Sequence, residues 1–352
     1  MIRKRIPWIL LLCVMNSALF AEDVSLTGVI YVKPPIKRVT HDFSFSSSPP
    51  RQLALLKIDL STKAQQAVAQ RIARVQTDTP IISSAREVQL AMNGVPVLNQ
   101  GSHGTCVTFA ATAAIDAILG KGDYISQLCQ LELGQHLEKN AYTSSGWNGS
   151  WGRIILSQMD VFGMVPKSYQ RSKGCGGLTE YPLAGAEPVV EQSLFDFHQM
   201  SEPMPQHQVA WSSILEAYQV SSDNINEENI LLDVKNALTH GDRVTFGVLL
   251  LDFNQGNVGA VGTYHERFDS WILTPEIAND INDRTEFAGH EMIITGFNDD
   301  AIATDAQGRK YQGLLTLRNS WGSDVGDKGN FYMSYDYFKA LILEAQRIRH
   351  LI

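Results

Sequence analysis

The sequence predicts an α+β protein in which helices precede strands along the chain. Apolar residues at helical spacing follow Cys106 as far as Leu119. Two further helical patterns cover roughly residues 125–137 and 151–161. From His290 onward the apolar residues recur with the period of β-strands, and turn residues separate the runs. A chain of 352 residues is long enough to bury a sizeable core in one large or two moderate domains.

Residues 1–21 are predicted to be a secretion signal. Basic residues at positions 3–5 precede an apolar run over 6–14, and we place the cleavage site after Ala21. A membrane anchor or a lipoprotein leader is the alternative, but the apolar run is short for a membrane span. No other transmembrane segment is predicted. We therefore expect an exported protein, secreted or periplasmic, and the short leader and few cysteines favour a bacterial source.

The composition argues against one class of partner. Hydrophobic residues make up 44% of the chain and charged residues 19%, as in soluble globular proteins, and the formal net charge is −8. Removal of the basic residues at positions 3–5 would make the mature chain still more acidic. Because no basic run follows the leader, the chain is not expected to bind nucleic acid.

Residues 22–90 look different from the rest of the chain. Alternation over residues 25–32 indicates a strand, and a loop rich in serine and proline follows over 43–50. Apolar residues at helical spacing then run over 60–75, with a hydroxyl side chain available as N-cap near the start. This region is therefore treated as a separate N-terminal segment.

A cysteine lies where a glycine-rich loop enters a predicted helix. The loop over residues 96–104 leads to Cys106, and the partial positive charge of a helix N-terminus favours the thiolate there. The side-chain amide of Gln100 can donate to an oxyanion that forms beside the sulfur. Downstream, His290 and Asn319 supply a base and a group to orient it. Each residue alone has an ordinary structural explanation, since a lone cysteine before an apolar helix is usually a buried hydrophobe.

Four sequence blocks carry these residues in a fixed order. The blocks are Gln100–Ala110, Gly289–Phe297, Asn319–Gly322 and Gly326–Phe338. In these blocks the chain resembles the papain family of cysteine peptidases, over roughly residues 95–350. One block alone would be weak evidence, whereas four blocks in the family's order are strong evidence.

The resemblance implies a two-lobed papain-like fold with the active-site cleft between the lobes. A helical lobe is expected over about residues 104–225 and an antiparallel β-barrel lobe over about 240–352, both within a peptidase domain of residues 91–352. Residues 22–90 would form a pro-segment that lies across the cleft until it is cut. The alternative is a permanent N-terminal subdomain, because the long helical signature of plant and lysosomal pro-segments is missing.

The same resemblance assigns the catalytic roles. Cys106 would be the nucleophile, and His290 its ion-pair partner, base and acid. Asn319 would orient the imidazole, and Trp321 would cover their hydrogen bond from water. Gln100 and the backbone N–H of Cys106 would form the oxyanion hole, where each donor lowers the barrier by about 3 kcal/mol.

Substrate-binding residues are expected in the glycine-rich block after the second helix and beside the catalytic histidine. Gly149 and Ser150 belong to the first group, although Ser150 replaces a family glycine. The resemblance implies that Gly247 and Glu291 take positions that line the pocket for P2, the second residue before the scissile bond. We expect a roomy, acidic pocket that favours arginine or lysine. The alternative is that Glu291 turns into a salt bridge or blocks the pocket.

The cysteine count leaves one possible pair. Of the four cysteines, one would leave with the leader and one would serve catalysis. The resemblance implies a disulfide between Cys129 and Cys175, and two unpaired buried thiols are the alternative. His103 and Trp147 stand where a second family disulfide would be, which means that both halves of that bridge are missing together.

The blocks lie farther apart than is typical of papain-like peptidases. The separations of Cys106 from His290 and from Asn319 together indicate roughly 40 to 60 residues beyond the roughly 130 to 150 expected. Residues 178–225 match no family block and are interpreted as a loop-and-helix insertion. Residues 253–287 are predicted to cover part of the cleft.

The sequence therefore predicts an exported cysteine endopeptidase, made as a zymogen, that cleaves peptides or proteins as a monomer. Its own N-terminal segment is a candidate inhibitor, and no metal, organic cofactor, nucleic acid or membrane partner is expected. One alternative is an amide-hydrolysing or acyl-transferring thiol enzyme of the deamidase or transglutaminase kind, although such enzymes normally lack the Asn-Ser-Trp-Gly block. The other is a catalytically silent binding protein on a papain scaffold.

Overall fold

The computed structural model describes residues 23–33, 52–75, 85–222, 225–251, 269–305 and 307–351. The predicted leader over 1–21, the loop over 43–50 and the first part of the predicted cover, 253–268, lie outside these residues. Within the described part of the chain, no helix is both long enough and apolar enough to span a bilayer.

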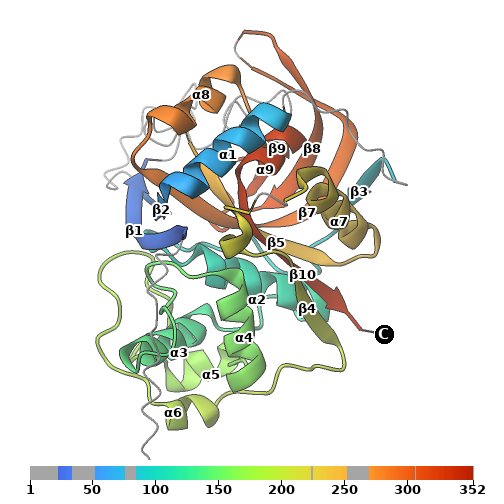
Figure 1. Cartoon of the computed structure of the whole chain (residues 1–352). Helices are drawn as coiled ribbons and strands as arrows, with labels where there is room; N and C mark the ends of the chain where they lie inside the picture. The colour runs from blue at the N-terminus through green and yellow to red at the C-terminus, as the bar shows by residue number, and fades with distance from the viewer. Residues whose placement is uncertain are drawn as a thin grey trace, which may run out of the picture.

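Two halves of different secondary structure lie one above the other in Figure 1. The lower half is helical, in the order that the sequence predicts. Its helices are α2 (Cys106–Leu119), α3 (Gln127–Lys139), α4 (Gly152–Phe162), α5 (Lys167–Lys173) and α6 (Leu194–His198). The upper half holds most of the strands and four more helices, α1 (Thr62–Val75), α7 (Glu227–Thr239), α8 (Pro275–Asp283) and α9 (Tyr335–Leu341). The predicted α+β class is confirmed.

The strands form one mixed sheet around a long central strand. The strands are β1 (Val24–Val32), β2 (Leu53–Leu60), β3 (Glu87–Gln89), β4 (Val209–Leu215), β5 (Arg243–Leu250), β6 (Ser270–Trp271), β7 (Phe287–Thr304), β8 (Lys310–Arg318), β9 (Asn330–Ser334) and β10 (Ile342–His350). Their order is β4-β10-β5-β7-β8-β9-β6, and β2 and β3 also pair with β7. Only β6 and β9 pair in parallel among the described strands.

The β-barrel that the resemblance implies is not closed in the described residues. The hydrogen-bonded path begins at β4 and ends at β6, and these two edges do not pair. The physical reason lies in the edges themselves, because β6 has only two residues and bonds to β9 alone. Helices α1, α7 and α9 pack over the sheet in the upper half of Figure 1.

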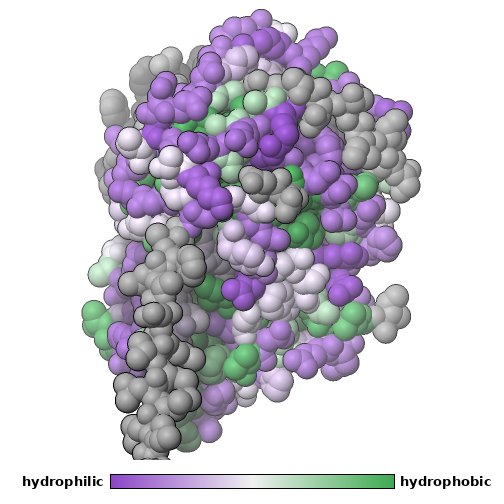
Figure 2. Space-filling view, in the orientation of Figure 1, coloured by the Kyte–Doolittle hydropathy of each residue, from purple (hydrophilic) through white to green (hydrophobic). Residues whose placement is uncertain are grey.

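Helix α2 lies at the centre of the molecule. Every residue from Cys106 to Ala117 is buried, and many of them are alanine, which allows the helix backbone to lie close to β7 and β5. Strand β5 is buried along its whole length. Figure 2 shows mostly hydrophilic residues on the sheet-containing half of this face, with apolar residues in small groups.

The sequence analysis missed the strands β2, β3 and β6, and also β4 and β10. Strand β4 lies within residues 178–225, so the prediction of a loop-and-helix insertion there is wrong for that stretch. Strand β10 lies between β4 and β5, near the middle of the sheet. Its pattern is hidden because Glu344 and Gln346 are buried together with their apolar neighbours. A strand with both faces covered lacks the alternation that sequence reading depends on.

The N-terminal segment joins the sheet. Strands β1 and β2 form an antiparallel pair, here called the N-terminal hairpin, and β2 pairs with β7 through Leu56 opposite Gly289. Helix α1 follows directly, and its first turn is capped by Ser61, whose Oγ accepts from the N–H of Ala64 at 3.1 Å. The predicted helix is therefore present, although Leu60 ends β2 and does not belong to it.

In the described part of the predicted cover, the ring of Trp271 lies beside that of Trp321, with centroids 6.4 Å apart. Helix α8 begins at Pro275 after an N-cap, Thr274, and packs against α1. The side-chain amide of Gln65 in α1 donates to the carbonyl of Ile281 in α8 at 2.6 Å. The cover over residues 253–287 remains a prediction.

Candidate active site

Cys106 is the first residue of α2 and its side chain is completely buried. Among the described cysteines it is the one without a disulfide. The backbone N–H of Glu291 hydrogen-bonds the thiol. Because Glu291 directly follows His290 in β7, this contact places the sulfur beside the part of the strand that carries the imidazole.

His290 and Asn319 are held together by a hydrogen bond between strand β7 and the turn after β8. His290 Nε2 lies 2.8 Å from Asn319 Oδ1, which also accepts from the backbone N–H of Ser320 at 2.7 Å. An oxygen that already accepts from a backbone N–H requires Nε2 of His290 to be the donor. In the neutral ring, Nδ1 then has a free lone pair, and it has no partner among the described residues. The ring is thus prepared to take a proton at Nδ1.

Trp321 covers this pair. Its ring stacks on the imidazole of His290 with centroids 4.3 Å apart and planes 22° apart, and it is 1% exposed. Water is kept from the hydrogen bond between His290 and Asn319, which strengthens that bond in the low local dielectric.

Gln100 is joined to the same network. Its Oε1 accepts from the hydroxyl of Ser320 at 2.7 Å, and its backbone N–H donates to the carbonyl of Ser320 at 2.8 Å. Its Nε2 donates to the carbonyl of His103 at 2.9 Å and to the carbonyl of Ala54 at 3.4 Å. Residues far apart in the sequence therefore converge, and the four predicted catalytic residues lie within one buried region.

The protonation states differ from the predicted ion pair. Burial raises the pKa of Cys106 to about 12, although the N–H of Glu291 lowers it in part. Burial lowers the pKa of His290 to about 4, against a smaller rise caused by Asn319. Both shifts favour the neutral form of the group. The N-terminus of α2 does not offset the loss of water around the thiol.

The N-terminal hairpin contacts several residues around the site. The carbonyl of Ala54 in β2 accepts from Gln100, and a Cβ placed on Gly149 would lie 3.0 Å from Leu56 Cδ2. On β1, Val29 approaches Gly104 so closely that a Cβ there would lie 2.8 Å from its Cγ2. The hairpin thus touches the helical half while β2 pairs with β7, which matches its place between the halves in Figure 1.

The predicted substrate-binding residues Gly149 and Ser150 lie in the loop before α4. Gly149 contacts the hairpin, as described above. Ser150 is fully buried, and its hydroxyl lies 3.1 Å from that of Ser144, so its polar atom is already engaged inside the helical half.

Gly247 and Glu291 belong to a row that includes a carboxyl group missed in the sequence. Gly247 of β5 pairs with Glu291 of β7 on one side and with Glu344 of β10 on the other. A Cβ on Gly247 would lie 2.9 Å from Glu291 Oε2 and 3.2 Å from Glu344 Cγ. The two carboxyl groups therefore lean over the glycine. Only recognition of β10 as a strand would have revealed Glu344.

This carboxyl pair has no cationic partner in the described residues. Glu344 Oε1 accepts from the backbone N–H of Gly152 at 2.8 Å, whereas Glu291 Oε1 has no partner. Burial, followed by the charge of Glu344, raises the pKa of Glu291 well above its ordinary value. Burial raises the pKa of Glu344 to about 7. The salt bridge considered for Glu291 is not found among these residues.

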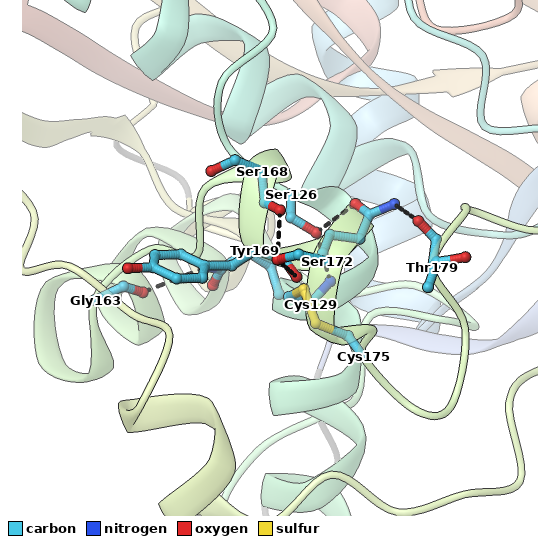
Figure 3. Close-up of a disulfide and its surroundings, with 10 residues drawn as sticks. Ser126, Cys129, Gly163, Ser168, Tyr169, Ser172, Cys175 and Thr179 are labelled. Carbon is cyan, nitrogen blue, oxygen red and sulfur yellow. Dashed lines mark hydrogen bonds between the residues drawn. A yellow bond between two sulfur atoms is a disulfide. The ribbon is translucent and has the colours of Figure 1, made fainter.

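The predicted disulfide is present and joins α3 to the turn after α5. Figure 3 shows the bond between Cys129 and Cys175 with Ser126 above it. The hydroxyl of Ser126 donates to Gln170 Oε1 at 2.7 Å and also caps α3. Where a second bridge is missing, His103 and Trp147 make an edge-to-face contact with centroids 5.2 Å apart.

The described residues hold no group of three or more histidine, cysteine or acidic side chains arranged to bind a metal ion. The chemistry available at the site is that of a thiol, an imidazole, two carboxamides and backbone donors.

Residues 206–348 match the family model of the Peptidase C1-like family, a range that includes His290 and Asn319. Among solved structures, the chain is similar to xylellain, a cysteine protease from Xylella fastidiosa, with 19% identity and a TM-score of 0.46 over 77% of this chain and 90% of that one. It is also similar to digestive procathepsin L 3 from the larval midgut of Tenebrio molitor, with 17% identity and a TM-score of 0.44 over 81% of this chain and 79% of that one.

A third similar structure is the clostridial cysteine protease Cwp84, with 17% identity and a TM-score of 0.44 over 73% of this chain and 55% of that one. No curated protein matches the chain. Because all three TM-scores lie below 0.5, the assignment rests on the family model. The match over residues 206–348 to the Peptidase C1-like family agrees with the resemblance found in the motifs.

Proposed function

We propose that the chain is an endopeptidase that uses Cys106 as nucleophile, His290 as base and acid, Asn319 as orienting group and Gln100 as oxyanion donor. The observation that carries this proposal is the buried network from His290 through Asn319 and Ser320 to Gln100. It leaves Nδ1 of His290 without a partner, on the strand that also contacts the thiol.

The reaction proceeds through an acyl-enzyme. His290 Nδ1 takes the proton of the Cys106 thiol while the sulfur attacks the carbonyl carbon of the scissile peptide bond. The oxyanion that forms accepts from the side-chain amide of Gln100 and the backbone N–H of Cys106. The C–N bond then breaks as His290 gives its proton to the leaving amine. Water, deprotonated by the same ring, cleaves the thioester and releases the carboxylate product, and the thiol regains its proton.

We propose further that the N-terminal hairpin makes this chain a zymogen. The carbonyl of Ala54 occupies the amide N–H of Gln100 that would otherwise stabilise the oxyanion. The hairpin contacts at Gly104 and Gly149 close the helical side of the site. A peptide substrate would have to displace the hairpin before it could reach Cys106. Helix α1 and its contacts with α8 and α9 can hold the segment on the sheet while the hairpin opens.

The two carboxyl groups beside Gly247 support a preference for basic residues at P2. We propose that Glu291 and Glu344, leaning over Gly247, line the P2 pocket and receive an arginine or lysine side chain. Two buried carboxyl groups without a cation are costly when ionised, and a basic ligand would remove that cost. We also propose export of the chain, on the pattern of residues 1–21 and on the disulfide, which forms in oxidising compartments.

The test of the proposed activity is covalent labelling of the full-length chain by an epoxide inhibitor of thiol peptidases, together with product analysis on a peptide mixture. We expect one label on Cys106, none on Cys106→Ala, and new amino termini among the products. Release of ammonia without new amino termini would replace the peptidase by a deamidase. Absence of both label and products from chains with an opened hairpin would point to a binding protein.

A further inference from the structure

Three consecutive residues from the insertion, Tyr181–Leu183, run along the loop that carries Gln100. We call them the strap. The carbonyl of Leu183 accepts from the backbone N–H of Ser102 at 2.9 Å, and the carbonyl of Pro182 hydrogen-bonds to His103. The loop and the strap are in such close contact that a Cβ on Gly101 would lie 1.9 Å from the carbonyl oxygen of Leu183. Only glycine fits there, and its φ of +61° favours glycine as well.

The hydroxyl of Tyr181 joins the two ends of this loop. It donates to the backbone carbonyl of Gln100 at 2.9 Å and lies 2.9 Å from the hydroxyl of Thr105, which can donate to it. Gln100 carries the side-chain donor of the oxyanion hole. Thr105 precedes Cys106, whose backbone N–H is the second donor. One hydroxyl therefore sets the separation of the two segments that supply the donors.

The ring of Tyr181 is held in place by aromatic neighbours. It stacks on Trp147 with centroids 5.9 Å apart and planes 6° apart, and Phe109 of α2 meets it edge-on at 4.9 Å. His103 also meets the ring edge-on. By the resemblance, His103 and Trp147 stand where the family would have a second disulfide. The packing of these rings thus occupies the place of that bridge.

We propose that Tyr181 is a positioning residue for the oxyanion hole, and that its hydroxyl and the aromatic cluster hold the loop of Gln100 in place without a covalent bond. This inference rests on the proposed peptidase function. Tyr181 touches neither the substrate nor the reacting atoms and acts through Gln100 and Thr105. Loss of its hydroxyl would let the two donors move relative to each other, and donors that are displaced by a fraction of an ångström stabilise the oxyanion less.

The experiment compares Tyr181→Phe with Tyr337→Phe in the full-length chain, each alone and together with Leu56→Arg, which is designed to open the hairpin. Tyr337 is the matched control because its buried hydroxyl also donates to a backbone carbonyl, that of Leu249 at 3.0 Å, in a different part of the fold. Peptide cleavage gives kcat and KM. Alkylation by a small haloacetamide gives the reactivity of the thiol, which needs no oxyanion hole.

We expect Tyr181→Phe to lower kcat about ten-fold, with KM and the alkylation rate unchanged, while Tyr337→Phe leaves kcat as it is. In a Gln100→Ala background, Tyr181→Phe should not lower kcat further, because the donor that Tyr181 positions is gone. If Tyr181→Phe does not fold, Thr105→Val removes the other hydroxyl of the pair and should lower kcat in the same way.

Two results would overturn the inference. An equal change in kcat for Tyr181→Phe and Tyr337→Phe would show that Tyr181 contributes only to the fold. If Tyr181→Phe lowers kcat in the Gln100→Ala background by as much as it does alone, Tyr181 acts through a group other than Gln100. If the unmodified chain and Leu56→Arg both fail to cleave peptides, the proposed function itself fails, and the inference fails with it.

Discussion

Two polar clusters are buried side by side along strand β7, and they differ in how far their hydrogen bonds are satisfied. His290 belongs to a network in which Asn319, Ser320 and Gln100 hold one another through bonds of 2.7 and 2.8 Å. Its neighbour Glu291 faces another carboxyl group and has an oxygen without a partner. The first cluster is organised before any ligand arrives. The second cluster is missing a proton or a cation.

The difference indicates separate tasks for adjacent residues. A preorganised network stabilises charge as it develops in a reaction, because its dipoles need not move. Two buried carboxyl groups without a cation cost free energy when they are ionised. Binding of a positive group offsets that cost. We therefore assign the chemistry to the first cluster and selectivity to the second, and the following predictions test that division.

The largest expected effect is on the first cluster. Gln100→Ala should lower kcat by about 10² to 10³-fold with little change in KM, because it removes one oxyanion donor. Gln130→Ala is the control, since Gln130 is also a buried glutamine whose amide donates to a backbone carbonyl, that of Gly163, at 3.3 Å. Steady-state kinetics on a peptide substrate measures both variants. Equal losses would mean that Gln100 has a structural role only.

The second-largest effect is expected on the labelling rate of Cys106 when the N-terminal hairpin is opened. Leu56→Arg places a charge where β2 packs against Gly149, and it should raise the rate of epoxide labelling of Cys106 more than about ten-fold, since burial of an unpaired charge costs several kcal/mol. Tyr31→Arg, on the exposed side of the same hairpin, should leave the rate unchanged. Identical labelling rates for the unmodified chain and Leu56→Arg would argue against occlusion by the hairpin.

A smaller effect is expected on selectivity from the second cluster. Glu344→Gln should reduce the preference for arginine over leucine at P2 by about ten-fold, because it removes one of the two negative charges available to the basic side chain. The control is Glu132→Gln, which removes another buried carboxyl group of raised pKa, about 7, in the helical half. A profile that favours bulky apolar P2 residues in the unmodified chain would contradict the acidic pocket.

The smallest effect concerns stability and pH. The pKa of Glu344 is raised to about 7 from an ordinary value of 4.5, so the folded chain binds more protons than the unfolded chain between these values. The stability that the neutral carboxyl group contributes is present below pH 4.5 and is lost as the pH rises through 7. Glu344→Gln should therefore gain stability relative to the unmodified chain over this window, on the order of 1 kcal/mol per pH unit.

Denaturant unfolding at pH 4.5, 6 and 8 measures this difference. Glu132→Gln should show a pH dependence of the same sign, because its pKa is also raised by burial, while its P2 preference stays unchanged. Parallel stability curves for Glu344→Gln and the unmodified chain would show that Glu344 is ionised in the fold without a penalty.

The candidate catalytic side chains and the fold class could be predicted from local sequence patterns, and the family resemblance added the disulfide. Cys106 opens an unbroken apolar helix, and Asn319 lies in a short block with Ser320 and Trp321. A local pattern survives because helix formation and turn geometry depend on neighbours in the chain. The protonation states could not be predicted in this way, since they depend on what covers the site.

The amino-acid sequence by itself thus determined the fold class, the disulfide and the candidate catalytic residues. The tertiary structure alone decided that the N-terminal hairpin pairs with β7, that Glu344 faces Glu291 across Gly247, and that Tyr181 reaches the loop of Gln100. Each of these is a contact between distant segments. Strand pairing and side-chain packing between such segments depend on the register and shape of the whole fold, and no short stretch of sequence encodes them.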